Sequence, residues 1–504
     1  MACGDTRRHA TRFARPNGRT PNGCSAAPGG GSGVERRRPT ARPPGRSTRG
    51  VASTRYRSRV SSPTAPSTPP ATSLRRPLLA WASWDWGVAS FQAVITTFVF
   101  TVYLTGTVAA DEASGSSALA TTIAISGVLV ALVAPVWGQR SDAAGKEYGR
   151  QRRLGVLTAL TVVATLLMAF VTPEPSSLLL GLVLLAAGTF TYELAQVEYN
   201  ALIYRLAPPG RTGWVSGFGW AAGYVGGIVL LILCFVLFLS DAPVFAFAEP
   251  GMSVRVIAVI CAVWLAIFGL PVLFMRFPYP PPPGDQDAAR VSVLGSYRLL
   301  FRRLARLYRD DRHLLGFLVS SAIYRDGLTA VFTFGGVLAS GTFGLSPGDV
   351  IIFAIAANVV SAVGAVAGGR LDDRVGPKIV IVVCLAALVL TAAFMLFATG
   401  TTAFWIGGTF LALFVGPAQA CSRSYLARVV PPGREGELFG LYATTGRAVS
   451  FLAPAMFALF VTLFGAQRWG ILGIGLVLLL GLATLLPVRS VPGSAPAGGA
   501  AARV

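Results

Sequence analysis

The sequence predicts an all-α membrane protein in which twelve transmembrane helices form two parallel six-helix repeats. Three observations lead to this fold class. Hydrophobic residues make up 53% of the 504 residues and charged residues only 13%, whereas soluble domains carry about a quarter charged residues. Apolar segments of membrane-spanning length recur along the chain, and two motifs occur once in each half. This composition argues against a soluble enzyme, and we expect no enzymatic activity.

Apolar segments of about 20 residues follow one another from Leu78 onward. At about 1.5 Å per residue, a helix of this length crosses the ~30 Å hydrocarbon core of a bilayer. The predicted spans are residues 80–108, 117–138, 153–172, 177–199, 214–240, 254–275, 314–341, 348–368, 377–398, 402–424, 437–464 and 468–487.

Basic residues fall in every second loop, and this pattern predicts the orientation of the helices. Arginine and lysine follow spans two, four, six, eight and ten, whereas the opposite loops carry mainly acidic residues such as Asp111 and Glu249. Because cytoplasmic loops hold the excess of Lys and Arg, these basic loops should lie inside the cell, with both termini in the cytoplasm. We therefore expect a multi-pass protein of the cytoplasmic membrane.

Composition divides the chain into five regions. Residues 1–76 hold 16 of the 43 basic residues, all Arg, and lack apolar periodicity, so we expect a disordered arm. Residues 77–275 and 313–488 are the two six-helix halves, residues 276–312 are the cytoplasmic linker, and residues 489–504 form a disordered tail. Within the linker, leucines alternate with arginines over residues 295–312 as in a basic amphipathic helix, which either lies on the inner membrane surface or packs on the bundle.

The same charge pattern suggests partners. Besides a small-molecule substrate and the bilayer itself, the arm and the linker helix are expected to contact anionic lipids. An arm without function, or a start codon chosen too far upstream, would leave the same sequence. We expect no nucleic-acid partner and a monomer. With two histidines and six singly placed cysteines, no metal site and no cofactor are expected.

Two motifs indicate an internal repeat. Residues 208–211, Pro-Pro-Gly-Arg, are matched 223 residues later by residues 431–434. A Gly-x-x-x-Asp-x-x-Gly motif after span two, residues 138–145, is matched 231 residues later by residues 369–376. Both copies share one predicted side, so the repeats are parallel, an arrangement that places a substrate site near mid-membrane between two rocking halves. The gating-loop residues are Gly138, Asp142, Gly145, Gly369, Asp373, Arg374 and Gly376.

The doubled loop motif resembles the signature of the major facilitator superfamily, and the resemblance covers about residues 78–488. Within it, residues 84–87 (Trp-Asp-Trp-Gly), residues 198–202 (Glu-Tyr-Asn-Ala-Leu) and residues 440–447 resemble the vacuole-effluxer branch. Fungal members of that branch are linked to amino-acid export from the vacuole, and the bacterial members, which this chain resembles, are mostly uncharacterised permeases. Ala143 stands where the superfamily usually has a cation, which implies that the first half holds its inner gate differently.

The loop aspartates are expected to act as latches. Asp142 and Asp373 fall just before the next predicted helix, where a carboxylate meets the positive end of a helix dipole. With Arg374 and Lys378 nearby, the second loop is expected to form a charged network that holds one conformation of a transporter. A static cap of the loop is the alternative.

Ionisable residues inside apolar spans cost several kcal/mol, so each is a functional candidate. Asp85 and Asp326 open spans one and seven and either bind a proton or a cationic group or cap a helix. Glu193 is the better proton carrier of the two acids in span four, and Arg423 and Arg447 each need a carboxylate of the protein or of the substrate. Other ionisable or polar candidates in the spans are Glu198, Arg325, Asn358, Gln419 and Tyr224.

Span five carries Gly219, Gly223 and Gly227 at four-residue spacing, which predicts a helix face that a neighbour approaches closely.

The sequence lacks a Walker motif, so energy should come from ion gradients. The leading hypothesis is a secondary transporter that moves a small polar organic solute, such as an amino acid, by alternating access coupled to protons, with efflux favoured by analogy to the family. The alternatives are a sugar and cation symporter of the same superfamily, and a transport-inactive membrane scaffold or sensor.

Overall fold

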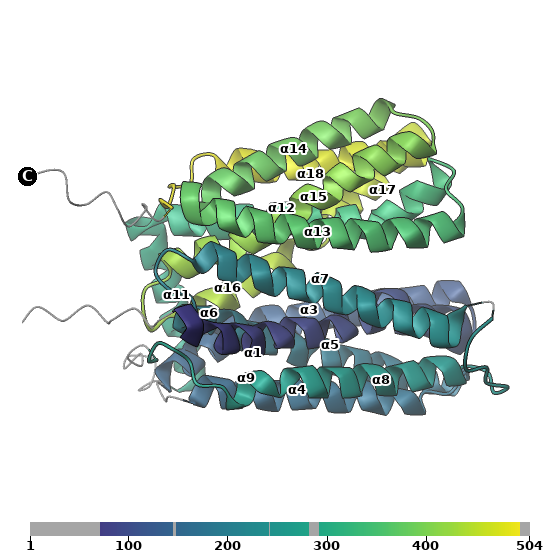
Figure 1. Cartoon of the computed structure of the whole chain (residues 1–504), viewed down its shortest axis with the longest axis horizontal. Coiled ribbons are helices and arrows are strands. Elements are labelled where there is room, and N and C mark those ends of the chain that lie inside the picture. Colours follow the sequence, from purple (N-terminus) through teal and green to yellow (C-terminus); the bar gives the residue numbers. More distant parts are fainter. Residues whose placement is uncertain (1–70, 145–147, 241, 282–291, 494–504) are drawn as a thin grey trace, which may run out of the picture. The chain divides into compact units, whose positions relative to one another are not determined.

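The computed structural model describes residues 71–144, 148–240, 242–281 and 292–493. These residues belong to one compact unit, Pro66–Val504. All regular secondary structure in the described ranges is helical, and twelve helical spans there are long and apolar enough to cross a membrane (Figure 1). The predicted fold class is confirmed. The predictions for residues 1–70 of the arm, for Gly145 and for residues 494–504 of the tail lie outside the described residues.

The first half contains six spans. Its first span is not a uniform α-helix, because π-helical stretches, Ser90–Phe98 and Leu104–Val108, interrupt it. The α-helices of this half are α1 (Ala71–Ala89), α2 (Phe100–Tyr103), α3 (Glu112–Ala143), α4 (Gly149–Leu167), α5 (Leu178–Ala201), α6 (Ile203–Leu206), α7 (Thr212–Cys234), α8 (Met252–Gly269) and α9 (Pro271–Phe274).

The second half also contains six spans, and a linker helix, α11 (Val293–Asp310), precedes it. One of these spans is interrupted at Ser450 and Phe451, between α16 and α17. The helices of this half are α12 (Arg312–Gly341), α13 (Pro347–Val375), α14 (Pro377–Phe397), α15 (Thr401–Val429), α16 (Glu435–Val449), α17 (Leu452–Phe464) and α18 (Gly470–Leu485).

Several helices are longer than the apolar segments that predicted them. Helices α3, α13 and α15 continue to Ala143, Val375 and Val429, past the predicted ends at residues 138, 368 and 424. Helical hydrogen bonding does not stop where the hydrocarbon stops, so hydropathy places the end of such a helix too early. For a similar reason α1 begins at Ala71, inside the range expected for the arm.

The two halves meet along α3 and α5 against α16, and along α7 against α13 and α15. Glycines allow the close approach. A Cβ atom on Gly436 would lie 2.6 Å from the carbonyl oxygen of Gly138, and one on Gly213 would lie 2.5 Å from that of Gly369. These two contacts are images of each other under the 223- and 231-residue displacements of the repeats. Such reciprocal contacts are the mark of a two-fold relation between the halves.

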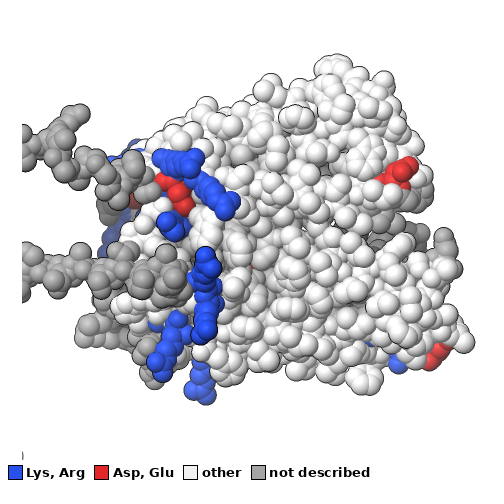
Figure 2. Space-filling model, in the orientation of Figure 1, with Lys and Arg blue, Asp and Glu red and all other residues white. Residues whose placement is uncertain are grey.

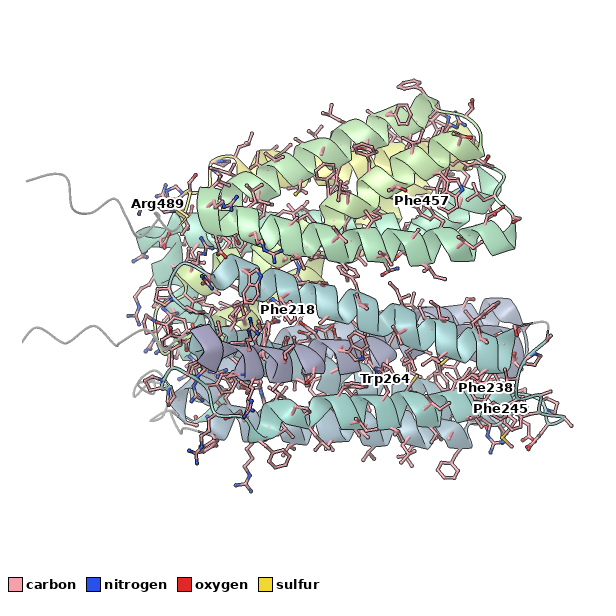
Figure 3. All side chains as sticks on the ribbon, viewed as in Figure 1. Phe218, Phe238, Phe245, Trp264, Phe457 and Arg489 are labelled. Atoms are coloured by element: carbon pink, nitrogen blue, oxygen red, sulfur yellow. The ribbon has the colours of Figure 1, made fainter. Side chains whose placement is uncertain are left out.

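Charge is concentrated at the two ends of the spans. Figure 2 shows most of the visible Lys and Arg, with some acidic residues, at one end, a few charged residues, mainly acidic, at the other, and a broad uncharged belt between them. We call the first the arginine-rich end; it is the end at which Asp142, Arg211, Asp373 and Arg434 lie. Figure 3 labels Arg489 at this end and the stacked rings of Phe238 and Phe245 at the opposite end. Large apolar side chains are exposed along the spans, as expected for a lipid-facing surface.

The linker helix α11 packs on the bundle with one face. Arg303 is buried and its Nη1 lies 2.6 Å from a carboxylate oxygen of Glu437 at the start of α16. On the first half, the hydroxyl of Tyr297 donates to the carbonyl of Leu132 over 3.2 Å. The helix α11 therefore packs on the bundle, which is one of the two arrangements expected from the sequence. It contacts both halves at the arginine-rich end.

Candidate functional site

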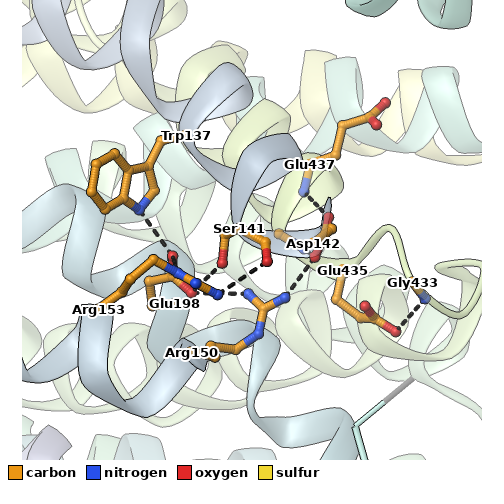
Figure 4. Close-up of polar contacts among 10 residues, drawn as sticks. Trp137, Ser141, Asp142, Arg150, Arg153, Glu198, Gly433, Glu435 and Glu437 are labelled. Atoms are coloured by element: carbon orange, nitrogen blue, oxygen red, sulfur yellow. Dashed lines mark hydrogen bonds and ion pairs between the residues drawn. The ribbon is translucent and has the colours of Figure 1, made fainter. Parts of the chain in front are cut away.

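Asp142, on α3 of the first half, joins the two halves at the arginine-rich end. Its carboxylate accepts hydrogen bonds from the backbone N–H groups of Gly436 and Glu437, both at 2.8 Å, in the first turn of α16. Arg150 fixes the same carboxylate at 2.5 Å and also reaches Glu198 at 3.1 Å. The carboxylate of Asp142 thus lies at the positive end of the dipole of α16, which belongs to the other half. A charge-assisted contact of this kind is strong, yet it can separate when the halves move (Figure 4).

Glu198 is the centre of the network behind Asp142. Its buried carboxylate accepts from the indole of Trp137 at 2.9 Å and from Ser141 at 2.8 Å, and it pairs with Arg153 at 3.1 Å (Figure 4). Both oxygens have several partners, so Glu198 holds α3, α4 and α5 together. Arg150 of α4 supplies the cation that Ala143, the residue after Asp142, does not.

Asp373 forms the matching joint from the second side. Its oxygens accept from the backbone N–H groups of Gly213 at 2.8 Å and Trp214 at 2.9 Å, in the first turn of α7. The cation beside it is Arg428 of α15, at 2.9 Å from Asp373 and 2.8 Å from Asp372. The gate is thus built twice, once by each repeat.

The structure corrects the predicted setting of these aspartates. Asp142 and Asp373 lie in the last turns of α3 and α13, not before the next helix, and each caps a helix of the opposite half. Arg374, expected in the network, is exposed and forms no ion pair among the described residues. Lys378 instead donates to the carbonyls of Leu486 and Val488 beyond α18.

A buried ion pair joins the halves deeper in the spans. Arg423 of α15 lies 3.3 Å from a carboxylate oxygen of Asp85 on α1. It also donates to the hydroxyl and the carbonyl of Ser216 on α7, at 2.9 and 2.7 Å, and to the side chain of Asn200 on α5 at 3.3 Å. One cation of the second half is therefore bound by three helices of the first.

Aromatic rings surround this pair. The guanidinium of Arg423 lies 5.0 Å from the ring centroid of Trp81 and 5.8 Å from those of Tyr199 and Trp220. Tyr199 stacks on Trp81 and donates its hydroxyl to Asp85 over 2.7 Å. A cation over aromatic faces in a desolvated pocket is held by about 2 kcal/mol or more.

The predicted glycine face of span five lies against this pocket. A Cβ atom on Gly219 would come within 2.8 Å of both Arg423 and Asp85, and one on Gly223 would contact the backbone of Asp85. Gly227 faces Ala89 and Ala93. The glycines admit α1 and, at Gly219, leave the volume that the ion pair fills.

A second pair between the halves lies on α5 and α16. Arg447 forms an ion pair and a hydrogen bond with Glu193, and both side chains are half-buried. Glu193, Gln196 and Asn200 share one face of α5, and an amide hydrogen bond joins Asn200 to Gln196. A polar stripe therefore connects the two inter-half ion pairs.

Asp326 has a different role from its sequence counterpart Asp85. Its carboxylate accepts from the backbone N–H of Ala453 over 2.6 Å, at the N-terminus of α17. Asp326 therefore makes a helix-capping contact at the interruption between α16 and α17, and its binding of a proton or a cationic group stays a prediction.

The remaining candidates are less closely bound. Tyr224 is half-buried, and its ring lies 6.3 Å from that of Phe332 across the halves. Asn358 donates to the carbonyl of Ala354 in its own helix, and Gln419 is half-buried on α15. Arg325 is half-buried, with its guanidinium 3.8 Å from the ring centroid of Tyr442.

The sequence patterns do not indicate Ser216, Arg428 or Asp372 as members of these networks. A signal for one contact was present: the 223-residue displacement makes Asn200 the counterpart of Arg423. Counterparts touch where they lie beside a two-fold axis, and these two do. The other residues are common polar types whose partners are distant in sequence.

Together these contacts tie the halves from the arginine-rich end to about the middle of the spans. In Figure 2 the surface is indented between the halves at the opposite end. Chemically, the arrangement offers carboxylates and arginines that can exchange partners when the halves move or when a carboxylate gains a proton.

Comparisons with known proteins agree with this architecture. Residues 209–495 match the family model described as "Vacuole effluxer Atg22 like", and residues 32–231 match that of the "Major Facilitator Superfamily". The uncharacterised MFS-type transporter YxiO of Bacillus subtilis is 27% identical over 415 residues, which are 81% of this chain and 93% of YxiO. Autophagy-related protein 22-1 of Neosartorya fischeri is 24% identical over 295 residues, 54% of this chain and 48% of that protein.

Solved structures show the same fold. The transporter FucP in its outward conformation superposes with a TM-score of 0.63 at 16% identity, covering 81% of this chain and 97% of FucP. The proton:xylose symporter XylE gives a TM-score of 0.61 at 13% identity, covering 83% and 95%. The family model spans more than half of the chain, and the fold, the repeat and the doubled gate agree with it. The chain therefore belongs to the vacuole effluxer family of the major facilitator superfamily of transporters.

Proposed function

We propose that this transporter moves a small polar organic solute across the cytoplasmic membrane by alternating access, coupled to protons, in the direction of export. One observation carries the proposal. The two halves are joined at one end by a symmetric pair of carboxylate caps, and deeper by ion pairs whose partners come from opposite halves. Such joints can open without breaking the core of either half.

We assign the arginine-rich end to the cytoplasm. Arginine and lysine in short loops favour the cytoplasmic side, and this end holds the loops after spans two, four, eight and ten. In this orientation the two halves are joined at their cytoplasmic side, so the conformation is outward-facing. The first span then begins, and the last span ends, on the cytoplasmic side.

Opening toward the cytoplasm requires Asp142 and Asp373 to leave the helix ends that they cap. The pair of Asp85 and Arg423 must part in the same step, because its partners lie in different halves. A proton on Asp85 would remove the charge attraction while Arg423 stays charged. We therefore propose Asp85 as one proton carrier and Glu193, bound to Arg447, as the second.

The direction and the solute class rest on family resemblance and on the polar stripe. A family described as vacuole effluxers favours export. Glu193, Gln196 and Asn200 face the other half within the spans, where they are available to a polar solute. Amino acids are the first class to test.

The test is flux in proteoliposomes that contain the purified protein and an imposed pH gradient. We expect the gradient to drive a solute from an amino-acid and sugar panel, and Asp85→Asn to uncouple that flux from pH. Asp349→Asn, a substitution of an exposed acid at the opposite end, is the matched control and should leave coupling intact. Uptake of a sugar with sodium or protons would favour a symporter, and no flux for any solute would favour a scaffold or sensor.

A further inference from the structure

Three arginines lie deep in the spans at the interface between the halves, and one differs from the others. Arg423 pairs with Asp85, and Arg447 pairs with Glu193. Arg325, near the middle of the span Arg312–Gly341, has no carboxylate within ion-pair distance among the described residues. A cation at this depth costs several kcal/mol unless an anion or water accompanies it.

Arg325 is held in place by its neighbours. Its Nη1 donates to the carbonyl of Tyr442 over 3.3 Å, and its guanidinium stacks on the ring of the same residue. The hydroxyl of Tyr442 is itself fixed by Ser422 at 2.7 Å, and Ser422 is bound to Tyr324 at 2.7 Å. An arginine has five N–H donors, so an oriented guanidinium retains donors for a further acceptor.

The side of α12 that carries Arg325 faces the other half. Phe332 lies two turns along the same helix, and its ring contacts that of Tyr224 on α7. Thr329, between them on this face, is exposed. The guanidinium therefore lies beside the path that a solute would follow between the halves.

The charges near Arg325 indicate which ligand fits. Gly446 of the neighbouring helix α16, in the same half, borders the guanidinium. The next residue, Arg447, pairs with Glu193 of the first half. Arg325, Arg447 and Glu193 sum to one excess positive charge. A single carboxylate neutralises that charge, whereas a phosphate dianion would leave a net negative charge within the spans. Arginine also binds the two oxygens of a carboxylate in a planar fork.

We propose that Arg325 receives a carboxylate of the transported solute and so selects carboxylate-bearing solutes over their neutral counterparts. This inference rests on the proposed transport function and names the residue that determines its specificity.

The test uses solutes that differ in the carboxylate: L-leucine against L-leucinol, lactate against lactamide, and glucuronate against glucose. Thermal stabilisation of the purified full-length protein in detergent reports binding. We expect stabilisation by at least one carboxylate member and not by its partner. Arg325→Gln should weaken the apparent affinity about 10- to 100-fold, as expected for a lost charged hydrogen bond, and Arg325→Lys should retain part of it.

Arg312→Gln, on the same helix at the arginine-rich end, is the matched control and should bind as the wild type. Size-exclusion chromatography shows which variants are folded, and the lysine variant keeps the charge if the glutamine variant does not fold. Equal stabilisation by the neutral partners, wild-type affinity in Arg325→Gln, or no stabilisation by any carboxylate would overturn the inference.

Flux measurements separate this inference from the proposed function. Carboxylate binding that depends on Arg325, without flux in proteoliposomes, would leave the site standing and refute transport. Flux of a neutral solute that is unaffected by Arg325→Gln would leave transport standing and refute the site.

Discussion

Arg423 shows how one buried residue couples the two halves. It belongs to the second half, yet its ion pair and its three aromatic neighbours belong to the first. Removing one member of a buried pair leaves an uncompensated charge, whereas removing both leaves none. The energetic role of this pair is therefore best read from single and double substitutions together.

Asp85→Asn should lower the stability of the closed arrangement by about 3–5 kcal/mol, because Arg423 remains buried without its partner. The double variant Asp85→Asn/Arg423→Gln should recover most of that loss. Thermal unfolding of the wild type, Asp85→Asn, Arg423→Gln and the double variant measures the coupling energy between the two residues. Additive losses in the double variant would show that the pair does not interact in the folded protein.

Asp142 is a second residue whose effect should be directional. Asp142→Asn keeps the size of the side chain but removes the charge that faces the N-terminus of α16 and Arg150. We expect this variant to populate the state that is open at the arginine-rich end. A cysteine in place of Thr444, whose hydroxyl on α16 donates to the carbonyl of Ala131 in the other half, should then react faster with a water-soluble maleimide than it does in the parent protein. An unchanged rate would mean that the cap does not hold the gate.

Helices α3 and α16 lie so close that a methyl group does not fit between them at Gly138. Gly138→Ala should therefore oppose closure at the arginine-rich end and lower the melting temperature. Gly127→Ala on the same helix is the control, since nothing lies within 4 Å of a Cβ atom there. Equal effects of the two substitutions would contradict this packing.

The outer face of α11 makes a prediction about lipids. Arg298, Arg302 and Arg306 are exposed on this helix, as is Phe301, whereas Arg303 packs on Glu437. Basic side chains interleaved with apolar ones favour an anionic membrane surface. Transport should therefore rise with the fraction of anionic lipid in proteoliposomes, and the triple Arg→Gln variant should lose that dependence. A lipid response that persists in the variant would assign it to another surface.

Sequence patterns predicted elements better than their interruptions. The twelve spans follow from apolar length alone, and the repeat follows from two motifs. The break between α16 and α17 was missed because Ser450 and Phe451 do not interrupt an apolar run. Asp326 caps α17 at that break, so this contact could not be predicted from the amino-acid sequence without knowing of the break. The partner of Asp142 was hidden for a related reason: Gly436 lies 294 residues away.

At the scale of the whole molecule, the two-fold relation organises the gate at the arginine-rich end. The Gly138–Gly436 and Gly213–Gly369 contacts are equivalent, as are the caps formed by Asp142 and Asp373. The symmetry does not extend to the centre, where Asp85 forms an ion pair between the halves and its counterpart Asp326 caps a helix. A symmetric gate around an asymmetric centre suits a carrier that rocks about one axis while binding an asymmetric solute.

The most direct test of this account is the distance between the two halves at each end of the spans. Double electron–electron resonance measures it between one spin label in each half. One pair, Arg211→Cys with Arg370→Cys, spans the arginine-rich end, and the other, Thr107→Cys with Ser340→Cys, spans the opposite end. On adding a transported solute under a pH gradient, we expect a population with a longer first distance and a shorter second distance. Distances that stay fixed, or that lengthen together, would contradict alternating access.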